Sequence, residues 1–361
     1  MTASKNFFWS TMIALAALVG GLFLWRHFTR VPTGVAYVSE EGGAISIIDL
    51  KNLKVIRRVQ PEDIAPRGIA VTFDGRYLIT SNKNTSDVAV FSTPSLRLLR
   101  RLHLGHGPEF VKMNPAGTRL FATFEPAAEK EGHAAQAANN QATNSDDDQD
   151  PPAQVASFQV GDWTEGPVST AGQETEGIEF SRDGKLMLVA NEAQDTIGVF
   201  DATSGTHLRD VNVKSYGSRP RGVKVSPEGD AYVVTTEASG TLLLMDANLN
   251  VLKSVPTAAK PYGVAFDRSG QRIFVAAALA RKLQVFSRDS LQLLAEVPVG
   301  QRCWHFTFTP DDSRILMACG RSNNIVVIDA NSYTPLSTIE GFKLPWGIVT
   351  YPRAYGSLGL P

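Results

Sequence analysis

Residues 66–80 read PRGIAVTFDGRYLIT, and this stretch decides the fold because related stretches recur along the chain. Apolar residues alternate with polar ones from Ile69 to Phe73, which predicts a strand with one buried face. The Asp74-Gly75 pair favours a tight hairpin turn, because glycine readily adopts the positive φ that such a turn needs. The apolar run RYLIT then predicts the returning strand. The stretch is therefore a β-hairpin.

The hairpin repeats at a nearly constant interval. Related stretches begin at residues 108, 176, 220, 261 and 303, and each is followed by a third and a fourth apolar run, such as VAVFS and LRLLRRLHL. The aligned turn residues are Gly75, Gly117, Gly184, Gly229, Gly270 and Asp312. Most steps between them are 41 to 45 residues, the period of a four-stranded propeller blade.

The two ends of the repeat region complement each other. Residues 34–59 supply the second, third and fourth strands of a unit but lack the first, and residues 344–352, LPWGIVTYP, supply only a first strand. Joined, they make blade one, which completes a ring of seven blades, and ring closure removes exposed sheet edges. We therefore predict an all-β fold, a single seven-bladed β-propeller over residues 31–361, closed by its terminal strands. An open array or a sandwich is the alternative.

The first thirty residues differ from the rest. Residues 7–25, FFWSTMIALAALVGGLFLW, carry no charge, and nineteen residues of helix span about 28 Å, close to the thickness of a bilayer core. This predicts an N-terminal membrane anchor over residues 1–30, with a transmembrane helix at about 7–25. A cleaved signal peptide is the alternative. Lys5 precedes the segment and Arg26 and Arg30 follow it, so charge alone does not fix its orientation.

One step of the repeat is too long. Gly117 and Gly184 are 67 residues apart, and the excess lies at about 126–153 in blade three. Its Ala, Asn, Gln and Asp residues cannot bury a core, which predicts a disordered acidic insertion. It is either a tolerated surface insertion, the favoured interpretation, or an acidic docking segment.

Composition excludes some functions. Lys+Arg 35 against Asp+Glu 36 gives a net charge of −1, so nothing global suggests nucleic acid. The chain lacks a nucleophile elbow, a phosphate loop, an HExxH motif and a CxxCH haem site. Cys303 and Cys319 lie nearly opposite each other on one predicted hairpin. They either bridge in an oxidising compartment or pack as two thiols; because direct cross-strand disulfides are strained, two thiols are favoured.

The repeats resemble the YVTN repeats of bacterial surface and periplasmic propellers over residues 34–352. They are most similar to propellers associated with PQQ-dependent catabolism, on the segments 299–329, 345–351, 108–115, 176–184 and 220–229. The resemblance implies a periplasmic location and a non-catalytic or unassigned role beside quinoprotein or cytochrome systems. With the predicted anchor, we expect a single-pass inner-membrane protein with its propeller in the periplasm.

One repeat position faces the predicted channel mouth in every blade. The residue before the strand-one glycine position is Trp346, Arg67, Glu109, Glu176, Arg221, Tyr262 and Trp304 in order round the ring, and His305 replaces the glycine itself in blade seven. These eight are our candidate ligand- or partner-binding rim, with aromatic residues on one arc and charges on the other. Alternatively, the same residues pack and pair with each other to seal the mouth.

Other charged positions have less specific interpretations. Lys112, Glu179 and Lys224 lie two or three residues further along strand one and predict ion pairs between blades near a wet channel. The second strands end in Glu41, Glu125, Glu192, Glu237 and Lys83. These suggest a solvated charged rim, which could also attract a basic protein such as a small cytochrome or hold a divalent cation. His106 and His305 loosely resemble haem d1 ligands, but a bound cofactor or metal is not the favoured interpretation.

These observations favour a non-enzymatic, membrane-tethered periplasmic interaction module that binds a protein partner on its loop face, with no catalytic residues. The alternative is a lactonase-type hydrolase or a haem d1-handling propeller. Lactonase-type propellers need convergent acids and a base, which the Glu and Arg ring could provide. Hydrolysis of simple lactones dependent on Glu176 and Arg67 would favour the alternative.

Overall fold

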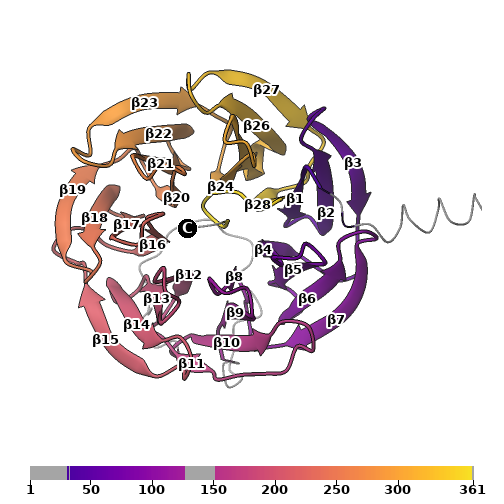
Figure 1. Cartoon of the computed structure of the whole chain (residues 1–361), viewed down its shortest axis with the longest axis horizontal. Helices are drawn as coiled ribbons and strands as arrows, with labels where there is room; N and C mark the ends of the chain where they lie inside the picture. The colour runs from indigo at the N-terminus through magenta and orange to yellow at the C-terminus, as the bar shows by residue number, and fades with distance from the viewer. Residues whose placement is uncertain (1–30, 32, 127–150, 360–361) are drawn as a thin grey trace, which may run out of the picture.

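The computed structural model describes residues 31, 33–126 and 151–359. In this part of the chain, seven four-stranded antiparallel sheets stand round one axis as the blades of a propeller (Figure 1). The predicted all-β, seven-bladed fold is confirmed. The repeat produces it because each sheet has an apolar face on both sides and can bury these only against neighbouring blades.

The strands of each blade run from the axis outward in the order that the repeat predicts. Blade one holds β28 (Pro345–Tyr351), β1 (Val35–Glu40), β2 (Ala44–Asp49) and β3 (Lys54–Val59). Blade two holds β4 (Pro66–Val71), β5 (Tyr77–Asn82), β6 (Asp87–Ser92) and β7 (Arg97–His103). Blade three holds β8 (Val111–Met113), β9 (Arg119–Phe124), β10 (Gln154–Gln159) and β11 (Ser169–Thr170). Blade four holds β12 (Thr175–Phe180), β13 (Leu186–Asn191), β14 (Thr196–Asp201) and β15 (His207–Asn212).

The remaining blades follow the same order. Blade five holds β16 (Pro220–Val225), β17 (Ala231–Thr236), β18 (Thr241–Asp246) and β19 (Val251–Pro256). Blade six holds β20 (Pro261–Phe266), β21 (Arg272–Ala277), β22 (Lys282–Ser287) and β23 (Leu293–Pro298). Blade seven holds β24 (Cys303–Phe308), β25 (Arg314–Cys319), β26 (Asn324–Asp329) and β27 (Pro335–Glu340), with a short 3-10 helix, η2 (Gly320–Ser322), after β25.

The closing blade forms as predicted. β28 pairs antiparallel with β1, with Tyr351 opposite Val35 and Val349 opposite Tyr37, and the Gly34 N–H donates to the Tyr351 carbonyl at 2.8 Å. The ends of the repeat region therefore share one sheet. Because of this, equivalent positions in all seven blades face the same axis.

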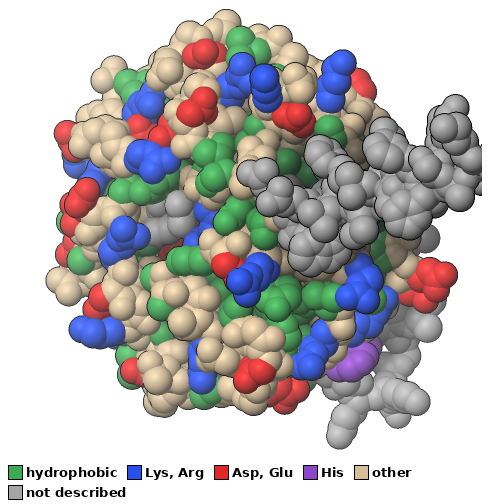
Figure 2. Space-filling view, turned by 45° about the vertical axis from the view of Figure 1, so that its right-hand side comes forward, with side chains coloured by type: hydrophobic (Ala, Val, Ile, Leu, Met, Phe, Trp, Pro, Cys, Tyr) green, Lys and Arg blue, Asp and Glu red, His purple; other side chains and the backbone are tan. Residues whose placement is uncertain are grey.

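The hairpin turns also form where the sequence places them. All six aligned turn residues have positive φ, from 57° at Asp312 to 79° at Gly229. Large side chains between the blades fill the core, with Phe121 and Phe180 of blades three and four at 4.9 Å between ring centroids. The outer strands lie at the edge of the disc and present a mixture of charged and apolar side chains to solvent (Figure 2).

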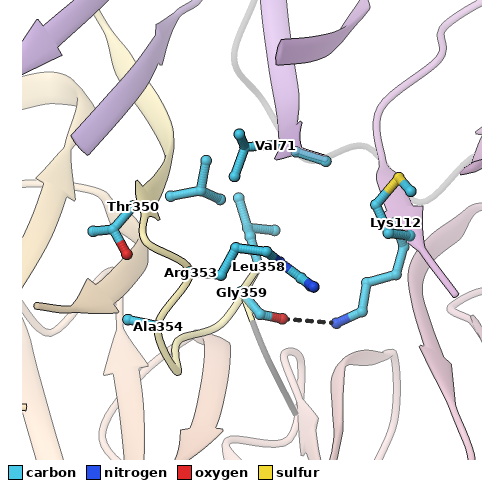
Figure 3. A pocket seen from close by; sticks show the side chains of 10 residues that line it. Val71, Lys112, Thr350, Arg353, Ala354, Leu358 and Gly359 are labelled. Atoms are coloured by element: carbon cyan, nitrogen blue, oxygen red, sulfur yellow. Dashed lines mark hydrogen bonds between the residues drawn. The ribbon is translucent and has the colours of Figure 1, made fainter. Parts of the chain in front are cut away.

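The segment after β28 enters the channel, which the repeat does not predict. The Phe308 N–H donates to the Tyr355 carbonyl at 2.8 Å, and the Ser357 N–H donates to the Phe306 carbonyl at 3.0 Å. This channel segment, residues 352–359, therefore lies along the inner edge of β24. At its end, the Gly359 carbonyl accepts a hydrogen bond from the Lys112 ammonium beside Arg353 (Figure 3).

The predicted ion pairs between blades are present, but they are buried, whereas the prediction placed them near a wet channel. Glu179 Oε2 lies 3.2 Å from the ammonium nitrogens of both Lys112 and Lys224. All three residues are buried, because the channel segment covers them, and Lys224 also donates to the Gly359 carbonyl at 3.0 Å. Burial lowers the pKa of Lys224 well below its ordinary value.

The cysteine prediction was wrong. Cys303 and Cys319 form a disulfide with their Cα atoms 3.8 Å apart, instead of two packed thiols. They pair directly across β24 and β25, immediately before the register shifts.

Two further predictions concern residues outside the described part of the chain. The anchor at 7–25 lies there, and no described helix is long and apolar enough to span a membrane. Most of the insertion at about 126–153 also lies there. The described residues on either side belong to β9 and β10, so the insertion joins the second and third strands of blade three.

Candidate functional site

A β-bulge that recurs in the blades turns the rim side chains toward the mouth. In blade two, Pro66 pairs with Asn82 and Ile69 with Thr80, so Arg67 and Gly68 together face one residue, Ser81. The same register shift occurs beside Trp346, Glu176, Arg221, Tyr262 and Trp304. A β-bulge bends the strand and turns a side chain out of the regular alternation. The repeated bulge explains why these residues converge.

The strand-one glycine lets neighbouring blades approach each other at the mouth. A Cβ atom on Gly222 would lie 2.5 Å from the Tyr262 carbonyl oxygen, and one on Gly177 would lie 2.4 Å from that of Arg221. Neither glycine has positive φ. The position therefore requires glycine for close packing against the next rim residue.

Two blades break this rule, and their larger side chains close the channel. Blade three has Phe110 and blade seven has His305 at the glycine position. The two rings meet across the axis at 6.2 Å between centroids, and His305 also packs against Tyr262 at 5.2 Å and Trp346 at 4.3 Å. These four rings form an aromatic plug just below the rim. The Trp304 ring lies against the backbone of Gly320.

His305 is fixed from below by the channel segment. Its Nδ1 atom lies 3.0 Å from Ser357 Oγ. That hydroxyl accepts from the Phe306 N–H at 3.0 Å and donates to the Phe306 carbonyl at 3.1 Å. Since the hydroxyl proton is used, Nδ1 of His305 carries the ring proton and Nε2 is an acceptor. Burial, with the charges of Arg221 and Lys224, holds the pKa of His305 well below its ordinary value, so the ring is neutral.

Arg221 is the centre of the largest charged cluster at the mouth. Its terminal nitrogens lie 2.8 Å from Glu176, 2.6 Å from Glu192 and 2.5 Å from Glu237. It donates to the Tyr262 hydroxyl at 2.9 Å and lies over that ring, 4.1 Å from its centroid. Three carboxylates from blades four and five thus hold one guanidinium rigidly.

A second layer of charge surrounds this cluster. Arg219 lies 2.6 Å from Glu192 and 2.5 Å from Glu174, and Lys260 lies 3.8 Å from Glu237. Four carboxylates therefore face three cations, so one bound proton would balance the cluster. Burial, opposed by Arg221 and reinforced by Glu176, raises the pKa of Glu192 to about 8. The predicted solvated rim is wrong for Glu192, which is 1% exposed.

A smaller cluster occupies the other side of the mouth. Arg67 pairs with Glu109 and lies 2.6 Å from Glu41, and Lys83 lies 3.7 Å from Glu109. Much of the candidate rim is thus paired internally. Within the described ranges, no three His, Cys, Asp or Glu residues are grouped as metal ligands.

A cavity beneath the rim is bordered by both kinds of group. Its lining includes Phe110, Glu176, Arg221, Tyr262, His305 and Ser357. It measures about 10 Å³, room for about one water molecule. Arg221 Nε and His305 Nε2 are both buried and have no hydrogen-bond partner among the described residues. A single water molecule could accept from the first and donate to the second, with Glu176 beside it.

The sequence did not single out several residues of this site. Glu174, Arg219 and Lys260 lie two positions before the rim residues of blades four to six, and all three have positive φ. Comparing the blades at that position would have found them. Phe110 replaces the strand-one glycine as His305 does, so the same comparison would have found it, whereas Ser357 lies outside the repeat and carries no such signal.

The comparisons with known proteins support the fold. Residues 154–250 match the family described as "Lactonase, 7-bladed beta-propeller", and no curated protein matches the chain. The chain is similar to the periplasmic gluconolactonase of Pseudomonas aeruginosa (TM-score 0.68, 16% identity, 90% of this chain and 99% of that chain covered). It is also similar to a putative 6-phosphogluconolactonase from Bacteroides uniformis (TM-score 0.68, 17% identity, 87% and 98% covered). A protein of unknown function from Desulfotomaculum acetoxidans has TM-score 0.71 at 14% identity, with 88% and 98% covered.

These findings correct one prediction and leave another open. The match of residues 154–250 contradicts the non-enzymatic interaction module and favours the stated alternative, a lactonase-type hydrolase. The similarity to YVTN-repeat propellers of PQQ-dependent catabolism stays a prediction. The matched segment supplies every carboxylate that binds Arg221, together with Arg219 and Arg221 themselves.

Proposed function

We propose that the chain is a lactonase-type hydrolase whose active centre is the cluster around Arg221. The observation that carries this proposal is the cavity shared by Glu176, Arg221 and His305, with two buried nitrogens that lack partners. Two of these three residues, Glu176 and Arg221, belong to the segment that matches a lactonase family. Hydrolysis of a lactone needs a positioned water, a base and a positive charge near the carbonyl oxygen. This cluster offers a cavity of the size of one water, a carboxylate and a guanidinium.

The cavity is too small for a lactone, so the water would occupy it and the lactone would lie on the outer side of the rim. There the side chains of Glu176 and Arg221 remain 16% and 15% exposed. Arg221 Nε–H would donate to the water, and His305 Nε2 would accept from it. Both groups would orient the water without exchanging a proton.

Glu176 is the better base of the two acceptors. A proton on His305 would create an imidazolium beside Arg221 and Lys224, whose charges already disfavour it. A proton on Glu176 only neutralises a carboxylate and places no new cation beside Arg221 and Lys224. In the proposed reaction, the water oxygen bonds to the lactone carbonyl carbon and its proton passes to Glu176. The tetrahedral intermediate then breaks its ring C–O bond, and the ring oxygen takes the proton from Glu176, which gives a hydroxy acid.

Arg221 would stabilise the oxyanion of that intermediate through its positive charge, because its N–H groups already bind the three carboxylates, Tyr262 and the water. Its guanidinium is held by three carboxylates and Tyr262, so it need not reorganise when charge develops. The buried Glu192 would not touch the substrate. Its raised pKa would help keep the cluster near neutrality.

The test is the hydrolysis of 1,5-gluconolactone and of unsubstituted δ- and γ-lactones by the purified full chain. The rate is measured by pH-stat above the spontaneous rate. Glu176→Gln should lower kcat by about 10²–10⁴-fold, while the fold, checked by circular dichroism, stays intact. Glu228→Gln is the matched control, because Glu228 is an exposed residue of a turn on blade five. Wild-type rates equal to the spontaneous rate for all of these lactones would contradict the proposal, as would full activity in Glu176→Gln.

The sequence supports a location for this activity. The uncharged run at residues 7–25 is long enough to cross a bilayer, and we propose that it tethers the propeller at the inner membrane with the blades in the periplasm. A disulfide in blade seven agrees with an oxidising compartment.

A further inference from the structure

The outer strands of the seven blades are not alike in charge. Together, β3 and β7 carry six Lys or Arg residues and no Asp or Glu: Lys54, Arg57, Arg58, Arg97, Arg100 and Arg101. The other five outer strands together carry two basic and three acidic residues. The excess of positive charge on the outer strands is therefore confined to two adjacent blades at one side of the disc.

Most of this charge is not neutralised within the described chain. Arg58 pairs with Glu40, and Arg101 pairs with Asp87. Of the other four, Lys54, Arg57, Arg97 and Arg100, none forms an ion pair with a described residue. Arg57 donates to the Pro94 carbonyl at 2.8 Å, and Arg100 to the Asp162 carbonyl at 2.7 Å. The first of these bonds crosses from β3 to the turn before β7, so the two strands form one continuous surface.

Apolar side chains lie between the cations on the same surface. Val55 and Ile56 on β3 are 38% and 58% exposed, and Leu98 and Leu99 on β7 are 36% and 41% exposed. Figure 2, in which this side of the disc is turned forward, shows Lys and Arg side chains gathered beside hydrophobic ones. We name the β3 and β7 residues together the basic edge.

β3 of the basic edge belongs to blade one, the first blade that the chain reaches. The described chain begins at Val31 and reaches β1 of blade one at Val35. Six residues before Val31, the uncharged stretch of residues 7–25 ends. A tether this short would hold blade one close to any membrane that the stretch enters, since five extended residues span at most about 18 Å.

We propose that the basic edge docks on anionic phospholipid, so that the propeller stands on its side against the membrane. Cations attract anionic headgroups, and the apolar side chains between them can enter the interface. Nucleic acid would use the charge but leave the four apolar side chains without a partner. The proposal is independent of the lactonase activity.

The outer strands offer a direct measurement. A fourth strand has a neighbour on one side only, so its outward N–H groups exchange with solvent unless something covers them. The full chain is placed in nanodiscs of phosphatidylcholine alone, or of phosphatidylcholine with phosphatidylglycerol. Amide hydrogen exchange in β3 and β7 is compared with that in β19 and β23. Insertion of residues 7–25 would occur in both kinds of disc, so the comparison separates docking from tethering.

Exchange in β3 and β7 should slow by at least tenfold in the anionic discs only, and 0.5 M salt should remove the difference. Arg97→Glu/Arg100→Glu should abolish it, since each cation near an anionic surface contributes about fivefold. Arg209→Glu/Lys253→Glu is the matched control on β15 and β19, and should keep the wild-type difference. Arg209 resembles Arg100 in donating to a carbonyl of the next blade, that of Asn248 at 2.9 Å.

Three results would overturn the proposal. One is equal exchange in the two kinds of disc. Another is a lipid-dependent difference that the Arg97→Glu/Arg100→Glu variant retains. The third is slow exchange of β7 in both kinds of disc that becomes fast when Asp146, Asp147 and Asp148 are changed to Asn. This result would mean that the acidic insertion, and not lipid, covers the surface.

Discussion

The Oγ atom of Ser357 lies 3.0 Å from Nδ1 of His305, although the two residues are 52 positions apart in the chain. The bond connects the segment inside the channel to the aromatic plug under the rim. It also sets which ring nitrogen faces the cavity, because the Ser357 hydroxyl is committed to the Phe306 backbone. The mouth therefore depends on a segment that belongs to no blade.

Ser357→Ala should impair both stability and turnover. The change leaves His305 Nδ1 and the Phe306 N–H buried without a partner, which costs about 1–3 kcal/mol. If His305 orients the water, kcat should fall about 10–100-fold with little change in KM. Denaturant titration and lactone kinetics measure the two effects.

Two further variants separate positioning from general damage. Ser357→Thr keeps the hydroxyl and should recover most of kcat, and Ser290→Ala, at an exposed turn serine, should change neither quantity. A loss of stability with unchanged kcat would mean that the bond is purely structural.

The strand-one glycines predict a contrast between two substitutions. Gly222→Ala would place a methyl group 2.5 Å from the Tyr262 carbonyl oxygen, so the blades must separate, at a cost of about 1–3 kcal/mol or more. Gly184→Ala meets only Pro115 at 3.6 Å but has φ of +72°, and should cost about 1 kcal/mol. Urea unfolding compares them. Because Gly222 adjoins Arg221, only the first change should also lower activity; equal effects of the two would contradict the packing argument.

The repeat explains why much of the fold was predictable. A 42-residue period fixes which residues are equivalent, and the split ends at residues 34–59 and 344–352 fix the closure. Equivalent residues must then face one axis, which is why Arg67, Arg221 and Tyr262 could be placed at the mouth from the sequence.

What the repeat could not reveal depends on contacts between unlike segments. The residues after Tyr351 have no counterpart in other blades, so their entry into the channel left no signal. The burial of Glu192 and the partners of Arg221 depend on how far each bulge turns its side chain. The sequence correctly placed Cys303 and Cys319 opposite each other on one hairpin. The argument that direct cross-strand disulfides are strained wrongly favoured two free thiols, at a position where the register of the sheet shifts.

The charge excess around Arg221 predicts a pH dependence of stability. The pKa of Glu192 is about 8 in the folded protein against an ordinary value of 4.5. A folded-state pKa above the unfolded one means that the folded protein binds the proton more tightly. The contribution of Glu192 to the free energy of unfolding should therefore be greatest below pH 4.5. It should fall as the pH rises from 4.5 through about 8.

Glu192→Gln removes this titration. Its melting temperature should fall less than that of the wild type between pH 6 and pH 8.5, and Glu228→Gln should behave as the wild type. Parallel pH curves for wild type and Glu192→Gln would show that Glu192 is ionised throughout, with the two arginines prevailing over burial.

The disulfide should contribute substantially to the stability of blade seven. It joins Cys303 and Cys319 across 16 residues, and a loop of about this length corresponds to about 3 kcal/mol of chain entropy. Guanidinium unfolding with and without reductant measures it. Cys303→Ala/Cys319→Ala should match the reduced wild type and should not respond to reductant; a response in the double variant would mean that the reductant acts elsewhere.

The buried triad of Lys112, Glu179 and Lys224 predicts an asymmetry between its members. Glu179→Gln would leave two lysines close together without their carboxylate, and breaking a buried pair in this way costs about 3–5 kcal/mol. Lys224→Met should cost less, because Lys112 still pairs with Glu179 at 3.2 Å and no charged group is left without a partner. The free energies of unfolding of the two variants at pH 7 test this. Equal losses would contradict this asymmetry and would mean that the hydrogen bond from Lys224 to the Gly359 carbonyl at 3.0 Å matters as much as the carboxylate.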